Sequence, residues 1–451
     1  MNKKINYTTA SVALQSVDFT YEDLNFETSS MPLFPFAPSW VPKNLSYAVY
    51  SLNHMSNACV NNELQVWARF VHHDENVFVN IRATAVKPED QTRLEAKRFI
   101  RFEGHDLLGK IESKQVYFGD SGQSLQSKDS NIPLTMTGTK VNDFGVGVYD
   151  SFWLWEYQDL KLDATGDNYI PVGDPDDWTV FETSMHRIFV TMDEPQSPWT
   201  ATPFRDIFED DFSKCPIWTE ALMWACTWAS GAKTIEEVAK KIADALFETE
   251  EFTYNVESWY STEEITQKEE KLNLAENTTS FQLSKMIERL YGGQGNGANL
   301  NCIDCALLVA SLTNLLGGKL QIGKLQGTDL LDHTDETADL NKFEVNAIKT
   351  IGMDLETTMA TLVDSKYFSN HMIAWMPATE TPDFENKDNL VFDGCVQRAT
   401  GENGETNESI SGQRLGSDTE EGYRTSIATK NELGLARCIA QEKTLRVIRI
   451  V

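Results

Sequence analysis

The stretch NCIDCALLVASLTNLLGG, residues 301–318, places two cysteines, Cys302 and Cys305, at the start of a long apolar run. Two thiols at this spacing can bind a metal ion, form a redox-active disulfide, or consist of one nucleophile and one packing residue. Each of these three kinds of site requires different partner residues elsewhere in the chain, so those residues can distinguish between them.

The position of Cys302 favours the nucleophile. Asn301 suits a helix N-cap and Asp304 suits a first turn, which puts Cys302 in the first turn of a helix that ends at a glycine pair. Free N–H groups and the helix dipole favour an anion there, and the thiolate is the reactive form of cysteine. Cys305 lies one turn further along, on an apolar face, and is interpreted as a packing residue.

The other two kinds of site fit less well. A structural zinc ion usually takes four Cys or His ligands, and His371 and Cys395 would have to complete the set, although they lack the spacing of a second ligand pair. A thioredoxin-like disulfide needs a strand-to-helix turn of a βαβ unit, whereas helices precede Cys302 and antiparallel strands follow it. We therefore expect no metal and no cofactor, with a Cys/His zinc site as an alternative.

A thiol nucleophile needs a base and a group that orients the base. Of the seven histidines, His371 stands at the start of the strand-like segment HMIAWMP, while five others lie in the β-rich N-terminal part and His333 lies in an acidic loop. Asp393 follows the apolar residues LVF, where a carboxylate is costly to bury without a partner. A strand-end histidine and an Asp-Gly turn would explain each residue singly. In the order Cys302, His371, Asp393 we interpret them as a catalytic triad.

Residues 1–195 are predicted to form a β-rich, sandwich-like domain that suits substrate or partner binding. The segments LQVWARFV and VFVNIRATAV, on either side of HHDEN, predict a β-hairpin. Strands are predicted at 64–71, 77–86, 146–158 and 186–195, with another that begins at VYFGDSG. Pro195, Pro198 and Pro203 then indicate a linker.

Residues 196–451 are predicted to form an α+β domain in which helices come first and antiparallel strands follow. Thr234 and Glu237 have the spacing of a capping box. The polar, Gly-rich stretch 399–422 predicts a long exposed loop. The predicted helices are 216–230, 234–249, 279–293 and 302–316, and the predicted strands are 319–327, 343–351, 371–377, 390–397 and 445–451.

The composition excludes several classes of protein. The 451 residues contain 39 Lys and Arg against 68 Asp and Glu, and the net charge of −29 repels nucleic acid and anionic lipid. No apolar run is long enough to span a bilayer, and the first residues lack the apolar segment of a secretory signal. Seven scattered cysteines fit a reducing compartment. We expect a cytoplasmic protein without nucleic-acid or membrane partners, of open oligomeric state; export without an N-terminal signal would leave the same sequence.

The cysteine motif resembles that of the transglutaminase-like superfamily of papain-type thiol enzymes. The family has a Cys followed by Asp and Ala at the second and fourth positions after it, on a buried helix that ends in glycine, as Cys302, Asp304 and Ala306 do here. The family's preceding helices end near an F-x-Y pattern, which residues 252–254 match. The resemblance covers residues 200–400 and implies a papain-like α+β fold.

The resemblance also implies a strand-borne His and then a strand-borne Asp, as His371 and Asp393 would be. The family commonly has a Trp two residues after its His, whereas Trp375 here follows four residues later, on the same strand face as His371. The family's oxyanion donor has no fixed counterpart in this chain. Gln294, in the loop GGQGNG, could supply a side-chain amide, and the backbone N–H of Cys302 would do the same.

Together these features predict a cysteine enzyme that attacks a protein or peptide amide through a thioester. With water as the acceptor it would be a peptidase, an amidase or a glutamine deamidase; with a lysine amine it would be a cross-linking transglutaminase. We expect hydrolysis, because excluding water demands a specialised tunnel. The alternative is an inactive protein that keeps the fold as a binding scaffold.

Overall fold

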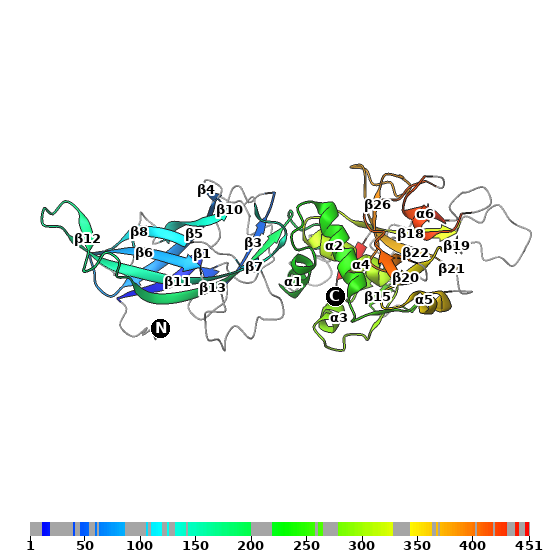
Figure 1. The fold of residues 1–451 in the computed structure, drawn as a ribbon, viewed down its shortest axis with the longest axis horizontal. Helices are drawn as coiled ribbons and strands as arrows, with labels where there is room; N and C mark the ends of the chain where they lie inside the picture. The colour runs from blue at the N-terminus through cyan, green and yellow to red at the C-terminus, as the bar shows by residue number, and fades with distance from the viewer. Residues whose placement is uncertain are drawn as a thin grey trace, which may run out of the picture. The chain divides into compact units, whose positions relative to one another are not determined.

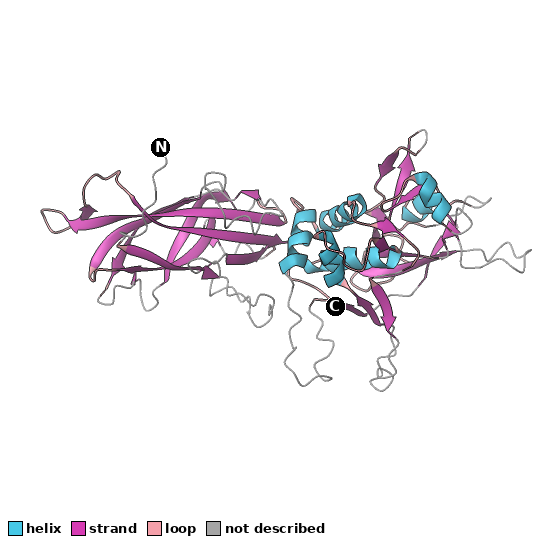
Figure 2. Cartoon of the chain, turned by 90° about the horizontal axis from the view of Figure 1, so that it is seen from below, coloured by secondary structure: helices cyan, strands magenta, loops and turns pink. Residues whose placement is uncertain are grey.

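The computed structural model describes twenty stretches of the chain. They are residues 11–18, 39–40, 46–53, 59–60, 63–85, 105–106, 110–119, 124–125, 131–140, 143–199, 219–257, 260–264, 278–327, 343–362, 367–368, 370–401, 404–417, 420–430, 438–441 and 447–450. The chain divides into two compact units, residues 1–193 and 194–451 (Figure 1). Figure 2 shows that the described helices all belong to the second unit. Pro203 of the predicted linker and the predicted loop around His333 lie outside the described residues.

The N-terminal unit contains one hydrogen-bonded sheet in the order β2-β1-β5-β10-β8-β6-β11-β13-β3, with β4, β7, β9 and β12 attached to its sides. Its strands are β1 (Val12–Asp18), β2 (Ser39–Trp40), β3 (Ser46–Ser51), β4 (Cys59–Val60), β5 (Glu63–His72), β6 (Val77–Ala85), β7 (His105–Asp106), β8 (Lys110–Phe118), β9 (Ser124–Leu125), β10 (Asn131–Lys140), β11 (Gly147–Leu162), β12 (Tyr169–Pro171) and β13 (Thr179–Thr191). β2 and β3, at opposite ends of the order, contact each other. One sheet therefore folds around the core where two separate sheets would form an ordinary sandwich.

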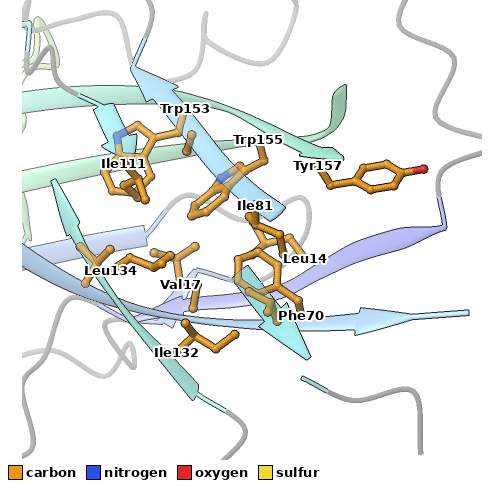
Figure 3. Close-up of a cluster of buried hydrophobic side chains, with 14 of the residues drawn as sticks. Leu14, Val17, Phe70, Ile81, Ile111, Ile132, Leu134, Trp153, Trp155 and Tyr157 are labelled. Atoms are coloured by element: carbon orange, nitrogen blue, oxygen red, sulfur yellow. The ribbon is translucent and has the colours of Figure 1, made fainter. Parts of the chain in front are cut away.

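The predicted hairpin of β5 and β6 is wrong. β5 pairs with β1, β4 and β10, and β6 pairs with β8 and β11, so two strands lie between them in the sheet. Their short connection instead joins two sides of the folded sheet, and Figure 3 shows Phe70 of β5 and Ile81 of β6 in the same apolar cluster. Alternation identifies a strand, but hydrogen-bond partners are chosen by distant parts of the chain.

The C-terminal unit has a central antiparallel sheet in the order β26-β23-β22-β18-β27. Its helices are α1 (Thr219–Trp228), α2 (Ile235–Glu248), α3 (Leu283–Leu290), α4 (Cys302–Leu315), α5 (Leu355–Thr361) and α6 (Tyr423–Ile427). Its strands are β14 (Thr253–Tyr254), β15 (Ser261–Glu264), β16 (Thr278–Phe281), β17 (Asn299–Leu300), β18 (Gln321–Gly327), β19 (Phe343–Glu344), β20 (Ile348–Thr350), β21 (Tyr367–Phe368), β22 (His371–Met376), β23 (Leu390–Phe392), β24 (Val396–Thr400), β25 (Thr406–Glu408), β26 (Gln413–Arg414), β27 (Cys438–Gln441) and β28 (Val447–Ile450). The arrangement is α+β.

Helix α4 forms the centre of this unit. Every residue of α4 except Ile303 is buried, because α1, α2, β18 and β22 all pack against it. Its start is a capping box: the Asn301 side chain accepts from the N–H of Asp304, and the Asp304 carboxylate accepts from the N–H of Asn301. No described helix combines the length and apolar character needed to cross a bilayer.

Several local predictions differ from the structure. The strands predicted at 343–351 and 390–397 are each divided into two, and Asp393 lies in the turn between β23 and β24 because its side chain accepts from the backbone of that turn. Residues 278–281 form β16, so the helix predicted at 279–293 is α3 alone. Thr234 caps α2, but the Glu237 carboxylate accepts from the N–H of Lys233, one residue before the position that a capping box requires. The stretch 399–422 contains β25 and β26 and buries Ile410, Ser411 and Leu415, because β26 pairs with β23 and Ser411 bonds to the backbone of Asp393.

The end of α4 generates a stability prediction. The Asn314 amide donates to the carbonyls of Ser197 (2.7 Å) and Leu320 (3.0 Å), and its Oδ1 accepts from the N–H of Leu320 (2.7 Å). We expect Asn314→Ala to lower the free energy of unfolding by about 2–3 kcal/mol, since it leaves these buried backbone groups unpaired. Urea denaturation measures the loss. Asn407→Ala, at an exposed strand position, serves as the control, and equal losses in the two variants would contradict the prediction.

Candidate active site

Cys302 is the first residue of α4, and the preceding strand fixes its position. β17 pairs in parallel with β14, and the N–H of Asn255 donates to the carbonyl of Leu300 at 2.7 Å. The Asn301 cap uses the N–H groups of Asp304 and Cys305, so the amides of Cys302 and Ile303 lie outside the cap, at the positive end of the helix. Cys302 is 7% exposed, whereas Cys305 is fully buried.

His371 is the first residue of β22 and is fully buried. Its Nε2 lies 2.7 Å from Oδ2 of Asp393, and Phe368 stacks on the imidazole with the ring centroids 4.9 Å apart. Cys302 also lies close enough to the imidazole to raise its pKa. Nδ1 is buried and forms no hydrogen bond with the described residues, so it is the ring nitrogen left for the Cys302 side. The described residues thus join Cys302, His371 and Asp393 in one chain of contacts.

The Asp393 carboxylate is surrounded by donors. Oδ1 accepts from the backbone N–H groups of Cys395 (2.8 Å) and Val396 (3.2 Å). Oδ2 accepts from the hydroxyl of Tyr423 in addition to its contact with His371. The Asp393 backbone is held by Ser411, whose Oγ accepts from its N–H at 2.9 Å and donates to its carbonyl at 3.0 Å. Such a set of bonds holds a buried carboxylate in one orientation.

The turn after Asp393 has a strict steric requirement. A Cβ added at Gly394 would lie 2.8 Å from Cδ2 of Leu246 and 3.0 Å from Cγ2 of Val309. Glycine therefore lets α2 and α4 approach the turn that supplies the two backbone donors. The Asp-Gly pair in the sequence is a packing requirement as well as a turn signal.

Burial and the neighbouring charge shift the pKa of His371 in opposite directions. Burial lowers its pKa most strongly, but the charge and hydrogen bond of Asp393 together with the nearby Cys302 outweigh it and raise the pKa to about 10. The imidazole is therefore protonated at neutral pH, which favours an imidazolium beside the Cys302 sulfur. Burial raises the pKa of Cys305 and of Cys395, so both stay thiols.

The two remaining predicted residues lie in the loop after α3 and on β22. Gln294 is exposed and lines a hollow of about 670 Å³ together with Arg289, Gly295, Asn296 and Gly297. Trp375 is buried, pairs with Gln321 and Val391 across the sheet, and packs against Phe384 with the ring centroids 5.1 Å apart. No contact of the described residues joins either side chain to Cys302.

Three residues that the sequence interpretation missed border the triad: Tyr423, Ser411 and Tyr254. Burial first, and then the proximity of Cys302, raise the pKa of Tyr254, so a protonated hydroxyl lies near the sulfur. In the sequence, only the F-x-Y pattern points to Tyr254. Tyr423 and Ser411 carried no signal, since they follow or lie within a stretch whose polarity predicts an exposed loop.

Three observations on the described residues bear on the other two kinds of site. Cys302 and Cys305 are both free thiols, so the pair forms no disulfide. Among the described residues, no three His, Cys, Asp or Glu side chains are arranged to hold a metal ion. Cys395 instead lies beside Cys305, where the two thiols interact with each other.

Asp393→Asn tests the electrostatics of the pair. The variant removes the charge that raises the pKa of His371, so burial dominates and the pKa should fall below its ordinary value of 6.5, as measured by an NMR titration of the imidazole. In the native chain, protonation of His371 contributes to the free energy of unfolding. This contribution is complete below pH 6.5 and is lost as the pH rises through about 10. In Asp393→Asn, the free energy of unfolding should not fall in this way between pH 6.5 and about 10.

Asp388→Asn is the matched control, because Asp388 is exposed and pairs with Arg414 on the surface. It should leave the His371 titration unchanged. A titration of His371 that is the same in Asp393→Asn as in the native chain would contradict the assignment of the pair.

Comparison with known proteins gives distant structural similarity. No protein-family model matches the chain, and no curated protein matches it. Among solved structures, that of red sea bream transglutaminase is similar over 78% of this chain and 51% of that chain, with 9% sequence identity and a TM-score of 0.33. The chain spans about half the length of that transglutaminase. The chemistry proposed below rests on the contacts of Cys302, His371 and Asp393.

Proposed function

We propose that the protein is a cysteine-dependent acyl-transfer enzyme that hydrolyses an amide of a peptide or protein through a thioester. The observation that carries the proposal is the continuous chain from Cys302 through His371 to Asp393. Each member occupies the position that its role requires: a sulfur at a helix N-terminus, an imidazole beside it, and a carboxylate behind the imidazole.

The first half of the reaction is acylation. The Cys302 sulfur attacks the carbonyl carbon, and the tetrahedral intermediate collapses as the carbon–nitrogen bond breaks. His371 gives the proton on Nδ1 to the leaving amine, and a thioester on Cys302 remains. Asp393 accepts the hydrogen bond of Nε2–H throughout, which fixes the ring orientation and stabilises its positive charge.

The second half is deacylation. Water approaches the thioester, and the imidazole, now neutral, takes a proton from it through Nδ1. The hydroxyl adds to the carbonyl carbon, the carbon–sulfur bond breaks, and the carboxylic acid leaves. The sulfur and the imidazolium return to their starting states, so the cycle balances without a cofactor.

Groups around Cys302 can stabilise the negative oxygen of both tetrahedral intermediates. The amides of Cys302 and Ile303 lie outside the Asn301 cap, and the protonated hydroxyl of Tyr254 is close to the sulfur. We assign the oxyanion to this end of α4 and not to Gln294, whose side chain is exposed in its own loop.

Selective alkylation tests the nucleophile. We expect iodoacetamide at pH 6 to label Cys302 at least about tenfold faster than Cys226, Cys305 and Cys395, because Cys302 keeps contact with solvent beside the His371 imidazolium and the other three thiols are fully buried. Peptide mass spectrometry of the native protein gives the rates. His371→Ala should slow the labelling of Cys302, and His73→Ala, at an exposed turn, should leave its rate unchanged.

Product analysis tests the reaction. The native chain is incubated with casein and with a glutamine-containing peptide, and the products are identified by mass spectrometry, with Cys302→Ala as the blank. Cleavage indicates a peptidase, conversion of Gln to Glu a deamidase, and a Gln–Lys link a transglutaminase. Slow, uniform alkylation together with unchanged substrates would contradict an enzyme and favour a binding scaffold.

A further inference from the structure

We propose that Tyr423 is a positioning residue of the site, and that its hydroxyl sets the strength of the hydrogen bond between Asp393 and His371. The inference rests on the proposed function, because Asp393 matters to the chemistry as the partner of His371. The Tyr423 hydroxyl donates to Oδ2 of Asp393, the same oxygen that accepts from Nε2 of His371. Two donors therefore share one carboxylate oxygen.

The position of Tyr423 does not depend on this hydrogen bond. Its N-terminal neighbour Gly422 packs closely on another turn, since a Cβ there would lie 2.9 Å from the carbonyl of Arg414 and from Cα of Gly416. The N–H of Arg424 donates to the carbonyl of Leu415 at 3.1 Å. Backbone contacts on this side thus fix the start of α6.

A second set of contacts fixes the other end of α6. The side-chain amide of Asn346 donates to the carbonyls of Thr425, Ser426 and Ala428, each at 3.1 Å. The N–H of Asn346 donates to the carbonyl of Ile427 at 2.9 Å. Because contacts hold both ends of α6, the fully buried Tyr423 side chain has a fixed position, and so has its hydroxyl.

A phenol at this place has a definite electrostatic effect. Asp393 is 3% exposed, so water contributes little to its solvation, and each donor takes a share of the negative charge. By taking charge from Oδ2, the Tyr423 hydroxyl weakens the pull of that oxygen on the Nε2 proton of His371. The proton is then held on the imidazole, where the proposed reaction needs it. The groups that face the pair from other elements are Cys302, Cys305, Cys395 and Tyr254.

The test is a spectroscopic signature in the full-length protein. The hydrogen-bonded Nε2 proton of His371 gives a low-field NMR resonance, assigned by its loss in His371→Ala. We expect Tyr423→Phe, which keeps the ring and deletes the hydroxyl, to move this resonance to lower field, because Oδ2 then attracts the proton more strongly. A role of Tyr423 in packing alone would leave the resonance in place and overturn the inference.

A second variant should shift the Nε2 proton resonance of His371 in the opposite direction. Replacing Tyr423 by difluorotyrosine keeps the shape and makes the phenol a stronger donor, so the resonance should move to higher field. This variant decides the question if Tyr423→Phe does not fold. Tyr149→Phe removes a buried phenol that donates to the carbonyl of Gly145 in the N-terminal unit, and it should change nothing.

Failure of this inference is distinct from failure of the proposed function. Fast labelling of Cys302 with an unmoved His371 resonance in the Tyr423 variants would overturn the role of Tyr423 alone. Slow labelling of native Cys302 would overturn the proposed enzyme, whereas the resonance would still show whether Tyr423 controls the Asp393–His371 bond.

Discussion

The buried carboxylate of Asp393 is the constraint on which the organisation of the C-terminal unit depends. A charge removed from water needs donors, because an unpaired one costs several kcal/mol. The donors here come from β22, from the turn after Gly394 and from α6. Holding one carboxylate therefore requires the central sheet, the close approach of α2 and α4, and the segment before α6 to meet at one place.

Burial also explains why chemically similar groups in this unit behave differently. It raises the pKa of Cys305 and of Cys395 and leaves them as thiols, while Cys302 keeps contact with solvent at a helix start beside an imidazolium. His371 is as deeply buried as His186 in the other unit, whose pKa burial lowers to about 3. The difference is the carboxylate beside His371, since His186 has Ser184 beside it instead. A neighbouring charge thus decides which buried histidine is protonated.

The sequence predicted a helix or strand correctly where the residues of that element alone determine it. The cap, length and end of α4, and the existence of β5, β6 and β22, follow from capping residues and from periods of apolar residues. The sequence misled the prediction of strand pairing, which depends on distant parts of the chain. β5 and β6 lie next to each other in sequence but pair with other strands. The stretch 399–422 has the composition of a loop, yet its Ser411 clamps the backbone of Asp393. Polarity does not distinguish a side chain that faces water from one that faces a buried carboxylate.

By itself the sequence determined which residues have reactive side chains, that Cys302 begins a helix, that His371 begins a strand and that Asp393 follows apolar residues, because capping and alternation are short-range effects. The tertiary structure decided that these three residues meet and that Tyr423 and Ser411 complete the surroundings of Asp393. The physical reason is that a buried charge is satisfied by whichever donors the packed chain brings within hydrogen-bonding distance. Those donors are separated from it by up to 30 residues, beyond the reach of any local pattern.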